Sequence, residues 1–186
     1  MEYSVIRSDR RSIAVEIKNC RAVVRAPLCY SDGQIENFVM RNEKWITTHL
    51  AKAEENRKMA AERFDMPASE IRAVLNTAKT VFSDRVAYYA PLVGVTYSRV
   101  SVRFMRSRWG SCSSKGALGF NSLLVLAPPE VLDSVVVHEL CHRKQMNHSD
   151  KFYSEVLRVF PDYNKCREWL DENSEILHAA GERACE

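Results

Sequence analysis

The chain has 186 residues, of which 46% are hydrophobic, and this is enough to bury a core as a single domain, which we expect to have two lobes. Its formal net charge of +3 is too small to indicate nucleic-acid binding by itself, and six cysteines without a CxxC pair favour reduced thiols over disulfides. No apolar run approaches the roughly 20 residues that a membrane-spanning helix needs, and the first residues do not form a signal peptide, so we expect a cytoplasmic location.

The first half of the chain combines strand and helix patterns. Apolar and polar residues alternate over residues 3–26, which predicts antiparallel strands with a hairpin. Residues 31–34 have the form of a capping box and precede apolar residues at helical spacing up to about residue 60. Another helix is expected from Pro67 to about Ala90. These elements predict an N-terminal lobe over residues 1–90.

The second lobe is expected over residues 91–186. Residues 99–104 alternate as a strand, and a further strand is expected over residues 117–126. Two prolines and an acidic residue then open a helix that leads to His142, and two more helices should follow residue 149. The whole pattern predicts an α+β fold, with a small, mostly antiparallel sheet packed on helices.

Within the helix that leads to His142, the sequence His-Glu-Leu-Cys-His begins at His138. Histidines four residues apart lie on one face of a helix, so both rings can bind one ion, and this donor set suits zinc. Glu139 would reach a water at the ion without being a ligand, which is the general-base position of the HExxH pattern. His148 is the expected third ligand, because a catalytic zinc usually has three protein ligands. The alternatives are a chance match on an amphipathic helix and a closed structural zinc site.

The position of His148 requires a reversal of the chain. A residue six positions after His142 on a continuing helix would point away from the site. We therefore expect the helix to end soon after His142 and Asn147 to adopt a left-handed backbone conformation in the turn. Ser149 would then cap the next helix.

Several motifs in the second half occur together. They are Arg108-Trp109-Gly110-Ser111-Cys112, Gly119-Phe120-Asn121, Ala127-Pro128, the segment from Val136 to His142, and Asn147-His148-Ser149 with Phe152. In this combination the chain resembles the YgjP-like metal-dependent hydrolases, a family related to the SprT-type zincin metallopeptidases. The resemblance runs through almost the whole chain and implies a zincin-like fold with one zinc ion per chain.

The resemblance implies zinc-assisted hydrolysis, in which the ion acidifies a water and Glu139 takes its proton and passes it to the leaving group. In zincins a sheet edge beside the active-site helix can bind an extended peptide, which makes residues 109–112 a candidate wall of the cleft. Four side chains have chemistry that suits substrate binding, although each could instead hold the fold: Arg108, Trp109, Asn121 and Tyr153.

Peptide hydrolysis is the leading interpretation, and two alternatives remain open. One is hydrolysis of nucleotide pyrophosphates of the UTP type, which is attributed to some YgjP-like proteins and would use arginines near the metal. The sequence has no glycine loop of the kind that cradles phosphate. The other is a nucleic-acid-associated module with a structural metal. It requires a basic face continuous with the metal cleft, to which Arg99 and Arg103 would contribute from one face of a strand.

Overall fold

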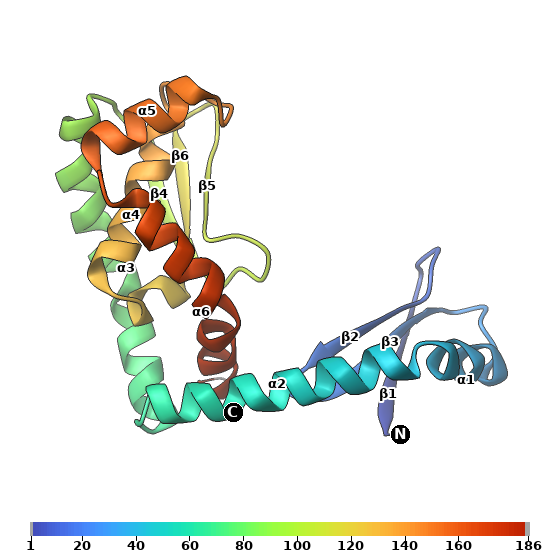
Figure 1. Ribbon diagram of the computed structural model, residues 1–186. Helices are drawn as coiled ribbons and strands as arrows, with labels where there is room; N and C mark the ends of the chain where they lie inside the picture. Colours follow the sequence, from blue (N-terminus) through green and yellow to red (C-terminus); the bar gives the residue numbers. More distant parts are fainter. Residues whose placement is uncertain (1, 185–186) are drawn as a thin grey trace. The chain divides into compact units, whose positions relative to one another are not determined.

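The protein is described by a computed structural model that covers residues 2–184 in detail (Figure 1). The chain divides into two compact units, residues 1–65 and residues 66–186. The lobes predicted from the sequence meet at residue 90, whereas this division lies before α3 (Ala68–Val93). The reason is that α3 packs on helices and a strand of the second unit.

The first unit contains a three-stranded sheet with the order β1-β3-β2, formed by β1 (Tyr3–Ser8), β2 (Ala14–Lys18) and β3 (Arg21–Pro27). Strands β2 and β3 form the predicted antiparallel hairpin. Asn19 and Cys20 connect them with φ values of 50° and 55°, as a tight two-residue hairpin turn requires. The prediction was wrong for β1, which pairs with β3 in parallel, because the chain passes to the opposite edge of β3 before β2 begins.

Two helices follow, α1 (Asp32–Arg41) and α2 (Glu43–Arg63). The predicted capping box is present, because Ser31 Oγ accepts from Gln34 N at 3.3 Å and Gln34 Oε1 accepts from Ser31 N at 2.9 Å. The single helix expected up to residue 60 is interrupted at Asn42, whose side-chain amide donates to Phe38 O at 2.8 Å. Asparagine breaks helices because its side chain bonds to nearby backbone groups.

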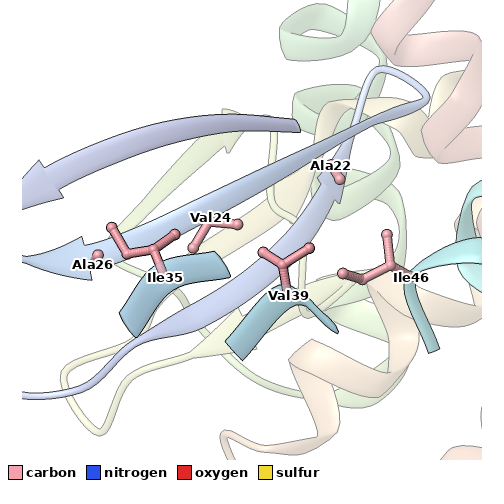
Figure 2. Close-up of a cluster of buried hydrophobic side chains, with 6 residues drawn as sticks. All are labelled: Ala22, Val24, Ala26, Ile35, Val39 and Ile46. Atoms are coloured by element: carbon pink, nitrogen blue, oxygen red, sulfur yellow. The ribbon is translucent and has the colours of Figure 1, made fainter. Parts of the chain in front are cut away.

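The core of the first unit lies between the sheet and these helices. Figure 2 shows Ala22, Val24 and Ala26 of β3 with Ile35 and Val39 of α1 and Ile46 of α2. All six side chains are buried. The alternation on β3 therefore gives the sheet one apolar face, which α1 and α2 cover.

In its described part, up to residue 184, the second unit starts with α3 and continues with three strands, a short 3-10 helix and three more helices. These are β4 (Arg99–Arg103), β5 (Gly110–Cys112), β6 (Ala117–Asn121), η1 (Ser122–Leu126), α4 (Pro129–Cys141), α5 (Asp150–Val159) and α6 (Tyr163–Arg183). The sheet has the order β4-β6-β5, in which β4 and β6 are parallel and β5 and β6 are antiparallel. The α+β prediction is confirmed. The sheets are not mostly antiparallel as expected, because each has one antiparallel and one parallel strand pairing.

Two element ends differ from the prediction. Helix α3 continues past Pro91 to Val93, because a proline in the last turn removes only its own N–H donor from the helical hydrogen bonds. The helix ends at Gly94, which has a φ of +78°. The strand expected up to residue 126 ends at Asn121. The side-chain oxygen of Asn121 accepts a hydrogen bond from Leu123 N at 3.2 Å and so caps η1, which follows the strand.

Helix α4 forms the centre of the second unit. It packs on α3, α5, α6, β5, β6 and η1, and nearly all of its side chains are buried, including Leu132, Val136 and Leu140 as predicted. Asp133 is the buried charged residue near its start and is paired with Arg85 of α3, whose Nε lies 2.6 Å from Asp133 Oδ1. Tyr89 also donates to Asp133 at 3.1 Å. These contacts fix α4 against α3. Within residues 2–184, no helix has both the length and the apolar composition needed to cross a bilayer.

Candidate metal centre and active site

The three predicted histidines converge at one point. His138 and His142 are at the end of α4, and His148 is in the loop before α5. His138 Nε2 lies 3.2 Å from His142 Nε2 and 3.1 Å from His148 Nε2. Nitrogens that share a tetrahedral zinc at about 2.0–2.1 Å are about 3.3 Å apart. The donor set therefore fits a zinc-type ion in both chemistry and spacing.

The protonation of the rings also fits an ion. Burial, together with the charges of the other two histidines, lowers the pKa of His138 to about 3, and burial lowers the pKa of His142. Both imidazoles are therefore neutral at pH 7. His142 Nδ1 lies 3.0 Å from Gln145 O, and because a carbonyl only accepts, this nitrogen carries the proton. The lone pair of His142 is then on Nε2, where the three rings meet.

Tyr163, the first residue of α6, lies at Nδ1 of His138, as Gln145 O lies at Nδ1 of His142. Its hydroxyl lies 2.8 Å from His138 Nδ1, and burial raises the pKa of Tyr163 to about 12, so the phenol stays protonated. The hydroxyl oxygen accepts from Nδ1–H when His138 uses Nε2 as a ligand. Sequence reasoning missed Tyr163, because 25 residues separate it from His138 and only the tertiary fold joins them.

Phe152 contacts the imidazole rings of all three histidines. It is fully buried, and its ring centroid lies 4.5 Å from that of His142, 4.8 Å from that of His138 and 5.0 Å from that of His148. The His142 and Phe152 rings are stacked, at an angle of 26°. One aromatic side chain of α5 therefore limits the orientation of all three imidazoles.

The chain reverses after His142, as the third ligand requires, but by a different route from the one predicted. Arg143 N donates to Leu140 O at 2.9 Å and Gln145 N donates to Cys141 O at 3.1 Å, which tightens the end of the helix. Asn147 is not left-handed, because Asn19 and Cys20 are the non-glycine residues with positive φ among those described. The turn closes with ordinary backbone angles, helped by the contact of the His142 ring with Gln145 O. Ser149 is the N-cap of α5, but its side chain makes no capping hydrogen bond.

Glu139 lies beside the histidine cluster and is 5% exposed. Burial raises its pKa to about 8, and the positive charge of Arg108 opposes this shift. Its Oε2 atom is buried and has no hydrogen-bond partner. A buried carboxylate oxygen without a partner is costly in a structural role, so this atom has the properties expected of a group that binds a water or a substrate proton.

Gly110 makes the position of Glu139 possible. A Cβ atom at residue 110 would lie 2.4 Å from Glu139 Oε1 and 2.6 Å from Glu139 Cγ. The glycine of the Arg-Trp-Gly-Ser-Cys motif is thus required by a close approach between β5 and α4. Among residues 2–184, strand β5 is bonded to β6 on one side only, so its other edge is free of pairing with any described strand.

Residues 11–73 and 67–173 match the model of the YgjP-like family, described as a metallopeptidase domain. The chain belongs to the YgjP-like metallopeptidase family. This confirms the resemblance inferred from the sequence motifs and supports a metal-dependent hydrolase.

Two solved structures are similar to part of this YgjP-like chain. The metallopeptidase zymogen abylysin of Pyrococcus abyssi is 21% identical, with a TM-score of 0.45, over 50% of this chain and 95% of that chain. The metallopeptidase zymogen jannalysin of Methanocaldococcus jannaschii is 22% identical, with a TM-score of 0.45, over 50% of this chain and 96% of that chain. A search of curated protein sequences gave no significant match.

Three of the four predicted substrate-binding residues of the YgjP-like protein surround the histidines. Arg108 is exposed and lines a cavity of about 470 Å³ together with the three histidines and Glu139. Tyr153 is half-buried, with its ring centroid 6.2 Å from that of His148. Trp109 lines a second cavity of about 270 Å³, which also includes His138 and Glu139.

Asn121 has a different environment. It is fully buried, and its amide donates to Met105 O at 2.6 Å and to Arg108 O at 3.3 Å. With the cap that it gives to η1, its hydrogen-bonding groups are used within the protein. We therefore assign Asn121 to the support of the segment that carries Arg108.

Arg143, directly after the second histidine, holds the β5–β6 turn. Its Nε donates to Thr96 O at 3.1 Å, its Nη1 donates to Ser114 O at 2.9 Å, and its guanidinium lies over Gly116, which has φ +79°. The end of α4 is thus tied to the turn that follows β5, the strand that lines the cavity over the histidines.

The basic stripe on β4 lies elsewhere. Arg99, Ser101 and Arg103 are exposed along this strand, as the alternation predicted. However, β4 is the sheet edge opposite β5, with β6 between them. The nucleic-acid interpretation required a basic face continuous with the cleft, and this arrangement counts against it.

Proposed function

We propose that this YgjP-like protein is a zinc-dependent peptidase in which His138, His142 and His148 hold the ion and Glu139 is the general base. The observation that carries the proposal is the meeting of three imidazole Nε2 atoms beside a buried carboxylate with an unpartnered oxygen. A zinc ion bound there would supply Lewis-acid activation of water and of the scissile carbonyl.

The residues of the chain have separate tasks in this proposal. Glu139 accepts a proton from the attacking water at Oε2 and delivers it to the leaving amine, for which a pKa near neutrality is well suited. Tyr163 and Gln145 hold the Nδ1 protons of His138 and His142. These contacts keep the Nε2 lone pairs directed at the common point.

The unpaired edge of β5 supports a peptide as the substrate. An extended peptide can add to such an edge as a further strand, and β5 leads from Gly110, beside Glu139, to Cys112 along the same cavity. Arg108 lines this cavity and the Tyr153 ring lies 6.2 Å from that of His148, which supports contacts of both with the peptide. We propose both as substrate-binding residues, together with Trp109.

The test compares parent protein with Glu139→Gln, which keeps the shape of the side chain and removes the base. Both proteins are loaded with zinc, their metal content is measured by elemental analysis, and they are incubated with unfolded proteins, with peptides and with nucleoside triphosphates. We expect new peptide fragments from the parent and a loss on the order of 100-fold or more in the variant at equal metal content. Equal cleavage by the two metal-loaded proteins would refute the role of Glu139, and Glu139-dependent release of pyrophosphate without peptide cleavage would replace the peptidase assignment.

A further inference from the structure

The cavity that contains Trp109 is distinct from the open cleft over the histidines. It has a volume of about 270 Å³ and lies between α4, α6 and the segment that leads into β5. It shares Gly110, His138 and Glu139 with the larger cavity of about 470 Å³. The two cavities therefore meet at the proposed catalytic carboxylate.

The walls of this Trp109 cavity are mainly apolar. Val135 of α4 and Leu170 of α6 are 7% and 6% exposed, and the Trp109 ring is fixed by stacking on His178, at 5.3 Å between centroids and an angle of 30°. Ser134 adds a small side chain whose hydroxyl is already used, because it donates to Val131 O at 2.7 Å. The interior thus offers contact surface and no free hydrogen-bonding group from Ser134.

The size of the Trp109 cavity suits a large side chain. An apolar cavity of about 150 Å³ is enough to bind benzene. The volume of about 270 Å³ found here accommodates a phenyl ring or a branched aliphatic group with room for the backbone at the opening. Ser134 contributes to this space, because it is the smallest side chain in the wall and is 1% exposed.

The charges at the opening of the cavity select for neither a cationic nor an anionic side chain. Arg167 and Asp171 are exposed, lie one helical turn apart on α6 and carry opposite charges. A cationic or an anionic side chain at the opening would therefore meet one like and one opposite charge, so the pair gives neither a net attraction. An anionic one would also approach Glu139.

We infer that the Trp109 cavity binds one large apolar side chain of the peptide substrate, next to the bond that is cleaved. This inference rests on the proposed peptidase function. A peptide paired with β5 passes Gly110, and side chains of an extended peptide point alternately to its two faces. The side chain beside the bond at Glu139 is the one that reaches between Trp109, Val135 and Leu170, while its neighbours lie over the open cleft.

The first measurement is a change in cleavage preference. Ser134→Phe fills the cavity from α4, and Ser83→Phe makes the same substitution on the exposed face of α3 as a control. Both are compared with the parent on a peptide library, with cleavage sites mapped by mass spectrometry. We expect the parent to cleave next to large apolar residues and Ser134→Phe to lose this preference by about tenfold or more relative to small residues. Ser83→Phe should keep the parental profile.

The second measurement does not depend on turnover. Binding of N-acetylphenylalaninamide and of N-acetylglycinamide to the zinc-loaded proteins is followed by the fluorescence of Trp109, with Trp109→Phe to assign the change. The phenyl compound should bind to the parent and to Glu139→Gln and should lose binding in Ser134→Phe. The glycine compound should not bind to any of them. If Ser134→Phe fails to fold, as judged by circular dichroism and metal content, Ser134→Val fills part of the same space and should give a smaller change in the same direction.

The outcomes separate the two hypotheses. An unchanged cleavage profile in folded, metal-loaded Ser134→Phe, or equal binding of the two compounds to the parent, would overturn the assignment of the Trp109 cavity. Cleavage would still depend on Glu139 in that case, and the peptidase function would stand. Binding of the phenyl compound without any Glu139-dependent cleavage would instead refute the peptidase function and, with it, the assignment of the cavity to a peptide side chain.

Discussion

Substitution of Gly110 by alanine tests whether the close approach of β5 to α4 sets the position of the proposed base. The new Cβ would lie 2.4 Å from Glu139 Oε1, 2.6 Å from its Cγ and 2.7 Å from its Cδ. Restoring an ordinary contact of 3.4 Å requires a displacement of about 1 Å. Because Cγ is among the affected atoms, rotation about the outer bonds of the side chain does not relieve the contact, and the whole side chain of Glu139 must move.

A misplacement of about 1 Å in a catalytic group costs on the order of 100-fold in rate. We therefore expect Gly110→Ala to lower kcat/KM for a peptide by about that factor, and overpacking to lower the free energy of unfolding by about 1–3 kcal/mol. Metal content should be unchanged, because the three atoms nearest to the new Cβ all belong to Glu139 and none to a histidine. Gly33→Ala is the control, since a Cβ there has nothing within 4 Å.

The assay needs the double variant as well. In the Glu139→Gln background, Gly110→Ala should lower activity no further, because the group that it displaces has already lost its function. Parental activity in metal-loaded Gly110→Ala would refute the argument that this glycine positions Glu139. An equal further loss in the double variant would show that residue 110 acts on catalysis by another route.

Three other predictions concern the metal centre. His148→Ala should weaken zinc retention, measured by competition with a chelator, by more than the roughly 10–100-fold that loss of an outer partner costs, and parental retention would exclude His148 as a ligand. Tyr163→Phe removes the hydroxyl 2.8 Å from His138 Nδ1 and should weaken zinc retention by about 10–100-fold with little change in fold, whereas unchanged affinity would show that Tyr163 does not orient the ring. Burial lowers the pKa of His138 to about 3 from an ordinary 6.5, so the unfolded chain binds more protons between these values and the metal-free protein should lose stability as pH falls through this range. Urea unfolding from pH 7 to pH 4 measures this, and His138→Gln should show a smaller loss than the parent. Equal losses in the two proteins would contradict the assignment.

The parts of the site that could be predicted from sequence are those governed by local spacing. His138 and His142 meet because residues four apart share a helix face, and the capping box at Ser31 forms within four residues. The reversal that brings in His148 was expected, but its backbone conformation at Asn147 was not predictable, because several turns of ordinary φ connect the same end points.

The parts that could not be predicted depend on contacts between distant segments. Tyr163 reaches His138 only because α6 packs on α4, and Gly110 is needed only because β5 lies against Glu139. The parallel pairing of β1 with β3 has the same origin, since alternation reports which face of a strand is apolar and not the direction of its neighbour. A glycine within a strand was nevertheless a usable sign, because such a residue often marks a close approach of another group.

Helix α4 carries the polar groups of the site although most of its other side chains are buried and apolar. The buried His142, the half-buried His138 and the buried Glu139 with its unpartnered oxygen lie at its end, and an unsatisfied buried polar group costs about 1–3 kcal/mol. The rest of the helix buries Leu132, Val136 and Leu140, each of which contributes about 1.5–3 kcal/mol. The stabilisation from these three side chains exceeds the cost at Glu139, and the pairing of Asp133 with Arg85 prevents an unpaired charge from adding to that cost. A helix that is apolar on nearly every side can therefore hold reactive groups in a buried environment, which is the condition that raises the pKa of Glu139 and keeps His138 neutral.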